Sequence, residues 1–268
     1  MPRLDVRNLS RRFGTKSAVD DVSLEVEAGE VLCLLGQSGC GKSTALRLIA
    51  GLADTTQGRI RWAGGVPSEN QIGVVFQEPT LLPWAPVAQN VFLPFRLQGK
   101  SYTSVKDDIL EALRLVGLEN FLEAYPRELS GGMKMRVSIA RAMVTNPALI
   151  LMDEPFAALD EITRFKLNND LLKLKAKIGC TVIFVTHSVF ESVFLSDRIV
   201  VMAARPGRVI REVQVDAPYP RTEEFRTSAE YAAHCRSASE ALAEAMGEPA
   251  CASPSKTHRW PPSPMSWT

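Results

Sequence analysis

The run Gly36-Gln37-Ser38-Gly39-Cys40-Gly41-Lys42-Ser43-Thr44 has the spacing G-x-x-x-x-G-K-[ST], which suits the binding of a polyphosphate. Its glycines allow successive backbone N–H groups to point inward around an anion. Lys42 would supply a cation for the β- and γ-phosphates, and the Ser43 hydroxyl would be a ligand for Mg²⁺. A short apolar segment, Val31–Leu35, precedes the run, and Lys42–Ala50 has helical spacing. The sequence therefore predicts a nucleoside triphosphate site between a strand and a helix.

Two acids end a second apolar segment. Ala148–Met152 is followed directly by Asp153 and Glu154. A strand beside the phosphate loop would bring Asp153 to the second coordination shell of Mg²⁺. Glu154, one residue further along, would point in a different direction from Asp153 and could orient or deprotonate an attacking water. This arrangement favours hydrolysis over transfer to an organic acceptor, although the sequence alone leaves both reactions open.

The elements that must position these groups alternate between strand and helix. Two segments, Val31–Leu35 and Ala148–Met152, are apolar on both faces, as central parallel strands are. The other predicted strands are Leu4–Leu9, Val22–Val26, Arg59–Trp62, Ile72–Phe76, Thr181–Val185 and Ile199–Met202. Helices are predicted over Glu161–Lys177 and Ser188–Leu195. This rhythm indicates an α/β fold with a mostly parallel central sheet.

Residues 79–143 interrupt this rhythm and carry no strong strand signal. Helices are predicted at Thr103–Val116, which is amphipathic, and at Ser130–Met143. We expect an inserted helical subdomain here, within a domain spanning residues 1–236. Glu223–Met246 is compatible with a helix, so residues 237–268 would hold the end of that helix and a Pro-rich tail, which we expect to be disordered.

The composition excludes several other classes of protein. The 268 residues include 31 Lys and Arg against 30 Asp and Glu, so the chain lacks the bulk basic charge of a general nucleic-acid binder. Its longest apolar runs are about five residues, whereas a membrane-spanning helix needs about 20. No apolar stretch follows the basic residues at the start, which argues against a secretory signal. The five cysteines form no C-x-x-C pair and suit a reducing cytoplasm.

A motif between the phosphate loop and the acidic strand makes a family resemblance specific. The segment Leu129-Ser130-Gly131-Gly132-Met133 combines a good helix N-cap, Ser130, with glycines that leave backbone N–H groups accessible to an anion. In this position LSGG resembles the signature of ATP-binding subunits of ABC transporters. The resemblance covers about residues 4–236. It implies a P-loop NTPase core with an antiparallel β subdomain and an inserted α-helical subdomain.

Further residues match that family in order. Gln77 matches the glutamine loop that reaches toward Mg²⁺ and the attacking water, and His187 matches the switch histidine that contacts the γ-phosphate. Ala158-Leu159-Asp160 resembles the loop that crosses the dimer interface. Phe13 lies where the family places a ring against adenine. Taken singly, Phe13 could be a core residue, His187 a helix cap and Gln77 a surface turn residue.

The resemblance also implies a homodimer. In this family Ser130, Gly131 and Gly132 close over the ATP held by a second copy, so that two chains enclose two nucleotides. Hydrolysis then loosens the pair.

A narrower similarity points to one branch of importers. The segments that carry it are Leu81–Trp84, Met133–Arg136, Glu161–Asn168 and Ala203–Arg208. They resemble the nitrate, sulfonate and taurine branch, which also includes systems for pyrimidine precursors. Trp84 falls where such subunits receive a coupling helix of the membrane partner. Simple core packing is the alternative for this side chain.

These similarities imply an Mg²⁺-dependent ATP hydrolase of an import system for a small solute. Its partners would be transmembrane permease subunits and, indirectly, an extracytoplasmic solute-binding protein. The chain would lie peripherally on the cytoplasmic face of the inner (plasma) membrane. Two alternatives are an ABC-type ATPase acting on nucleic acid or ribosomes, and a P-loop small-molecule kinase. The near-neutral charge and the single cassette disfavour the first, and the kinase would need neither Ser130–Gly132 nor His187.

Overall fold

The computed structural model describes residues 4–62, 71–219 and 221–247. Its larger sheet has the strand order β5-β6-β7-β3-β8-β9, and every neighbouring pair is parallel except β8 and β9. These strands are β3 (Val31–Gly36), β5 (Ile72–Val75), β6 (Leu149–Asp153), β7 (Thr181–Thr186), β8 (Arg198–Ala203) and β9 (Arg208–Gln214). The predicted α/β fold with a mostly parallel sheet is confirmed. The edge strand β9 was not predicted.

A second, smaller sheet is antiparallel, as the family resemblance implied. It has the order β2-β1-β4 and consists of β1 (Leu4–Phe13), β2 (Lys16–Val26) and β4 (Gln57–Trp62). Alternating burial along β1 and β2 shows why the chain forms strands here, since one face packs inward and the other is polar. Both strands extend further than the alternation in the sequence predicted.

Helices cover the central sheet. They are α1 (Lys42–Ile49), α5 (Glu161–Ile178), α6 (Val189–Leu195), α7 (Glu223–Arg226) and α8 (Ala229–Met246). Of these, α5, α6 and α8 begin at a residue whose side chain caps the helix. The segment Glu223–Met246, which the sequence indicated as compatible with a helix, forms two helices, because Ser228 separates them. The Ser228 hydroxyl accepts a hydrogen bond from the Tyr231 N–H and begins α8. The predicted boundary at residue 236 lies inside α8.

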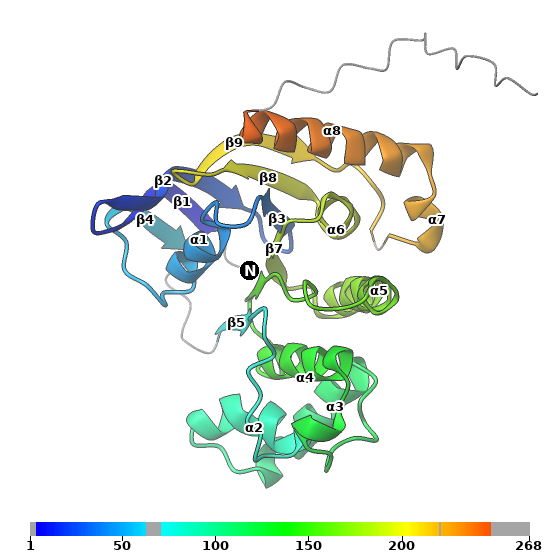
Figure 1. The fold of residues 1–268 in the computed structure, drawn as a ribbon. Coiled ribbons are helices and arrows are strands. Elements are labelled where there is room, and N and C mark those ends of the chain that lie inside the picture. The colour runs from blue at the N-terminus through cyan, green and yellow to red at the C-terminus, as the bar shows by residue number, and fades with distance from the viewer. Residues whose placement is uncertain (1–3, 63–70, 220, 248–268) are drawn as a thin grey trace, which may run out of the picture.

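The inserted subdomain consists of α2 (Val87–Leu97), α3 (Lys106–Leu115) and α4 (Gly131–Met143), grouped at the bottom of Figure 1. Short 3₁₀ turns at Thr103–Val105 and Pro126–Glu128 precede α3 and α4. The prediction missed α2, which is rich in apolar residues and contains Pro94. The subdomain packs by contacts of α4 with α2 and α3, and α4 also meets α5 and β5.

The buried strands separate two apolar cores. In β3, Val31, Cys33 and Leu35 join the core beneath α5, α6, α8 and the helical subdomain, whereas Leu32 and Leu34 face the core shared with α1 and the small sheet. Strand β6 alternates in the same way. This explains why both segments are apolar on both faces.

Among the described residues, no helix combines the length and the apolarity that crossing a lipid bilayer requires. We predicted disorder for residues 247–268; Gly247 is the C-cap of α8, and residues 248–268 lie outside the described residues.

Candidate active site

The phosphate loop connects the carboxyl end of β3 to the first turn of α1, as predicted. Its last glycine, Gly41, has a φ of +98°, in the left-handed region that favours glycine. A Cβ at Gly41 would lie 2.6 Å from the Ala18 carbonyl oxygen, and one at Gly36 would lie 2.7 Å from the Met202 carbonyl oxygen. Tight backbone packing therefore requires glycine at both ends of this part of the loop.

The order of the strands brings the other predicted residues to the same edge. Strands β5, β6, β7 and β3 are neighbours and parallel, so their carboxyl ends meet. Gln77 follows β5, Asp153 ends β6 and Glu154 follows it, and His187 follows β7.

Lys42 is 3% exposed and inserts its amine into the loop. Its Nζ donates hydrogen bonds to the carbonyl oxygens of Gly36, at 2.8 Å, and Gln37, at 2.9 Å. The same atom lies 3.4 Å from Glu154 Oε1. A buried, multiply held ammonium group at the mouth of a helix N-terminus is an appropriate counterion for phosphate.

Ser43 and Asp153 meet across the site. The Ser43 hydroxyl donates a hydrogen bond of 2.6 Å to Asp153 Oδ1, and Asp153 is buried at the end of β6. Hydroxyl and carboxylate oxygens are hard ligands of the kind that Mg²⁺ prefers, so the donor set fits this ion.

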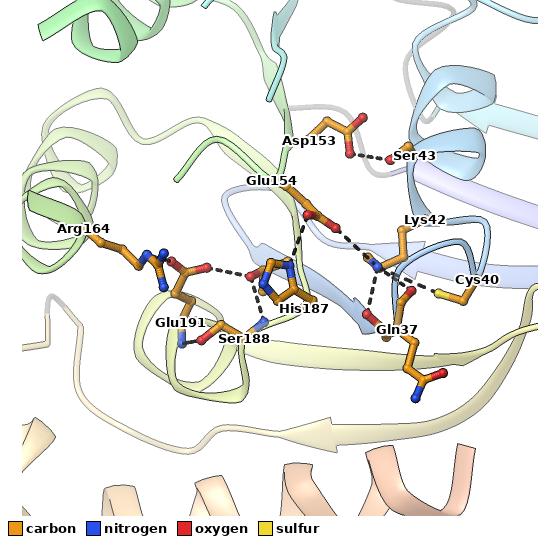
Figure 2. A network of polar contacts seen from close by, with 12 residues as sticks. Gln37, Cys40, Lys42, Ser43, Asp153, Glu154, Arg164, His187, Ser188 and Glu191 are labelled. Atoms are coloured by element: carbon orange, nitrogen blue, oxygen red, sulfur yellow. Dashed lines mark hydrogen bonds and ion pairs between the residues drawn. The ribbon is translucent and has the colours of Figure 1, made fainter. Parts of the chain in front are cut away.

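Glu154 and His187 form a second contact. Glu154 has a φ of +46°, and its N–H donates to the Val185 carbonyl oxygen at 3.0 Å, which fixes the turn after β6. The turn places Glu154 Oε2 3.1 Å from His187 Nδ1 (Figure 2). Glu154 thus contacts both Lys42, at the start of α1, and His187, which follows β7.

A cavity of about 310 Å³ lies over the phosphate loop. The residues that line it come from the phosphate loop, from Gln77 and Glu154, and from two segments that were not predicted to belong to the site. The full lining is Ser17, Ala18, Ser38, Gly39, Gly41, Lys42, Ser43, Thr44, Gln77, Glu154 and Arg205. Ser17, Ala18 and Arg205 are the additions. Backbone hydrogen bonds that Gly207 makes with Ala18 and Asp20 hold the Arg205 turn beside β2, a long-range contact that no local pattern shows.

Several predicted binding residues do not line this cavity. Ser130 and Asp160 instead cap helices, since the Ser130 hydroxyl accepts from the Met133 N–H at 3.3 Å and Asp160 accepts from the Thr163 N–H at 3.0 Å. The hydrogen bonds from Thr163 hold the pKa of Asp160 below its ordinary value. Gly131 and Gly132 lie in the first turn of α4.

Phe13, also outside the cavity lining, is exposed at the end of β1, and the Arg11 guanidinium lies 4.8 Å from the centre of its ring. Core packing is thus excluded for Phe13. The same holds for Trp84, which is 74% exposed.

Comparison with known proteins identifies the family of the chain. The family model described as "ABC transporter" matches residues 19–157. The chain is 43% identical over 222 residues to the nitrate import ATP-binding protein NrtD of Synechocystis, covering 80% of this chain and 83% of that protein. It is 41% identical over 217 residues to the aliphatic sulfonates import ATP-binding protein SsuB of Bacillus cereus, covering 80% and 85%.

Solved structures show the same fold. A dimeric ATP-binding cassette bound to ADP and Pi superposes with a TM-score of 0.69 at 32% identity, covering 80% of this chain and all of that one. The cbiO1 protein of Clostridium perfringens, part of the ABC transporter complex cbiONQ, gives a TM-score of 0.71 at 28% identity, covering 79% and 88%. The P-loop NTPase fold is confirmed, and the chain belongs to the ABC transporter family as an ATP-binding subunit and ATP hydrolase.

Proposed function

We propose that this ATP hydrolase energises an import system for a small solute of the nitrate, sulfonate or taurine kind, or a pyrimidine precursor. The contacts of Glu154 with both Lys42 and His187 support the hydrolytic part. The names of its relatives, which are nitrate and aliphatic sulfonates import proteins, support the import part.

In the proposed reaction, Lys42 and the N–H groups of residues 36–44 bind the phosphates of ATP. Glu154 accepts a proton from the attacking water, or orients that water, as a carboxylate beside the γ-phosphate can. His187, held by Glu154, and Gln77, which lines the cavity, contact the γ-phosphate and the water. Phe13 would stack on adenine from the β subdomain.

Mg²⁺ fits the oxygen donors at this site. Ser43 and Gln77 would hold the ion directly, and Asp153 would hold it through its second coordination shell. When bound, the ion neutralises charge that develops on the β- and γ-phosphates.

A second copy of the chain completes each site in this proposal. Ser130, Gly131, Gly132 and Asp160 lie outside the cavity of their own chain but present a helix N-terminus and a capping loop. In a homodimer they would close over the nucleotide of the other copy, because a helix N-terminus attracts phosphate.

The membrane partner would be a permease bound at the surface around Trp84. An indole exposed to this degree has no packing role within the chain, and exposed aromatic side chains are enriched at protein interfaces. The chain would then lie on the cytoplasmic face of the plasma membrane, and the solute-binding protein would act on the other side.

The test is affinity purification of the tagged full chain from detergent-solubilised cells, comparing wild type with Trp84→Ala. We expect a multi-spanning permease with the wild type, its loss with Trp84→Ala, and an unchanged ATPase rate and melting temperature, because the substitution is on the surface. Recovery of ribosomes, or ATPase stimulation by added DNA or RNA, would instead support the nucleic-acid alternative.

A further inference from the structure

Glu191, on α6, is a buried carboxylate that the proposed reaction does not use. It is 7% exposed, and Thr186 Oγ1 donates a hydrogen bond of 2.5 Å to its Oε2. Its own N–H donates to Ser188 Oγ at 3.3 Å, as the N-cap of α6 requires. Burying a carboxylate costs free energy unless the group is paired and hydrogen-bonded, so we ask what the contacts of Glu191 do.

Those contacts hold both neighbours of His187. The Ser188 N–H donates to Thr186 Oγ1 at 3.0 Å, so the Thr186 hydroxyl lies between Glu191 and the turn that carries the histidine. Thr186 ends β7 and Ser188 begins α6, and His187 is the residue between them. Glu191 is therefore linked by hydrogen bonds, through the Thr186 hydroxyl, to the turn that carries His187.

The other oxygen of Glu191 faces Arg164 on α5 (Figure 2). Arg164 Nε lies 3.5 Å from Glu191 Oε1, and Arg164 Nη2 donates to the Leu159 carbonyl oxygen at 2.9 Å. Leu159 is the centre of the loop Ala158–Asp160, and its Cδ2 would lie 3.6 Å from a Cβ at Gly131. Arg164 thus connects this loop, which packs on the start of α4, to Glu191 and through it to the turn that carries His187.

The ion pair has room to tighten. In the described part of the chain, neither Arg164 Nε nor Glu191 Oε1 has a hydrogen-bond partner, and 3.5 Å exceeds the 2.7–3.2 Å of an N–H···O bond. A displacement of the loop toward α6 by a few tenths of an ångström would convert the contact into a charge-assisted hydrogen bond.

We propose that Arg164 and Glu191 are positioning residues for ATP hydrolysis: they transmit the position of the loop Ala158–Asp160 to His187. Closure of the loop tightens the Arg164–Glu191 contact, and Glu191 then sets the turn Thr186–Ser188 so that His187 meets Glu154 and the γ-phosphate. The proposal rests on the role proposed for His187 and for the dimer.

The first measurement is steady-state ATP hydrolysis by the full chain carrying Arg164→Gln or Glu191→Gln. A misplaced catalytic group costs up to about 100-fold in rate, so we expect kcat to fall at least about tenfold, with KM for ATP within about threefold of wild type. Arg164→Lys keeps the charge but cannot contact Leu159 and Glu191 in the same way. Its kcat should therefore lie between those of wild type and Arg164→Gln. This variant also serves if Arg164→Gln does not fold.

The second measurement does not depend on activity. The chain has three histidines, so selective ¹⁵N-histidine labelling gives an NMR spectrum in which His187 is assigned with His187→Ala. We expect the His187 ring signals to shift in Arg164→Gln and Glu191→Gln, whereas the His234 signals stay in place.

Arg136→Gln is the matched control. Arg136 has the same 28% side-chain exposure as Arg164, donates to a backbone carbonyl (Val116) and pairs with a carboxylate (Asp170) between α4 and α5. It does not contact the His187 turn, so its substitution should change neither kcat beyond about twofold nor the His187 signals.

The possible results separate cleanly. A fall in kcat together with shifted His187 signals supports the proposal. Unchanged kcat in both variants, or a fall with unmoved His187 signals, overturns it, as does an equal effect of Arg136→Gln. If His187→Ala hydrolyses ATP at the wild-type rate, the proposed role of His187 fails instead, even where the signals shift.

Discussion

Lys42 Nζ and Glu154 Oε1 lie 3.4 Å apart, although their residues follow different strands and are distant in the sequence. The cation proposed for the phosphates and the carboxylate proposed for water activation therefore neutralise each other. The γ-phosphate of ATP and Glu154 would compete for the same ammonium group. If both proposed roles hold, Glu154 would act on nucleotide affinity as well as on the chemical step.

Glu154→Gln should abolish steady turnover and retain ATP binding. The amide cannot accept a proton from water, so kcat should fall at least about 100-fold, and affinity should be equal or higher because the competing charge is gone. The variant should also accumulate as a nucleotide-bound dimer, measured by analytical ultracentrifugation with ATP. Glu119→Gln, a change on the surface, is the control. Hydrolysis by Glu154→Gln at a near-normal rate would refute the assignment.

Lys42→Ala should weaken ATP binding itself. Hydrogen bonds to charged groups contribute about 1.5–3 kcal/mol, which corresponds to about a 10- to 100-fold loss of affinity in equilibrium dialysis. The variant should also melt at a lower temperature, because the carbonyl groups of Gly36 and Gln37 lose their donor. Lys173→Ala, at an exposed position of α5, should change neither quantity. An unchanged ATP affinity in Lys42→Ala would contradict the proposed role.

Alkylation of Cys40 should block ATP binding, but slowly at neutral pH. The thiol is buried inside the phosphate loop, and this burial raises its pKa, so the reactive thiolate is scarce at pH 7 and increases as the pH rises. Mass spectrometry gives the fraction of Cys40 that is alkylated, and this fraction is compared with the residual ATPase activity. Bound ATP should protect Cys40 from alkylation. Cys180→Ala, which removes a different buried thiol, should be inactivated with the wild-type time course. Full activity of the Cys40-modified protein would exclude the idea.

The stability of the chain should depend on the ionisation of Glu191. Burial raises the pKa of Glu191, and hydrogen bonding from Thr186 and the charge of Arg164 only partly oppose this. The folded state therefore holds the proton more tightly, and the stability this gives is present below the unfolded pKa and is lost as the pH rises through the folded pKa.

Glu191→Gln has no proton to lose, so its free energy of unfolding should increase relative to wild type as the pH rises from about 4 to 8. Urea unfolding at each pH measures the difference. Glu111→Gln is the control of opposite sign, because hydrogen bonds from Lys177 and Arg114 lower the pKa of Glu111 at the surface. The free energy of unfolding of Glu111→Gln relative to wild type should decrease slightly as the pH rises. A Glu191→Gln difference that is constant or falls with pH would contradict the prediction.

The sequence predicted best what local pattern and burial determine. The strands β3 and β6 are apolar on both faces because each separates two cores, and this property is visible in a single segment. The phosphate loop and the Asp153–Glu154 pair follow from those strands. The structure then brings Gln77, Glu154 and His187 to neighbouring strand ends, as the family resemblance implied.

Contacts between distant segments could not be predicted in this way. Strand β9 is an exposed edge strand that needs only β8 as a partner, and α2 carries Pro94, which normally argues against a helix interior. Arg205 joins the cavity through a backbone contact between Gly207 and Ala18. The Arg164–Glu191 pair joins α5 to α6, and nothing in the spacing of the two residues indicates that their side chains meet.

The position of β3 between β7 and β8 has a consequence for protein synthesis. A nascent chain that ends before Thr181 already contains the whole phosphate loop, yet both strands that flank β3 are still untranslated. Since closing such distant pairs is slow, the ability to hold a nucleotide should arise only near the end of translation, and ribosome-bound fragments should not retain ATP.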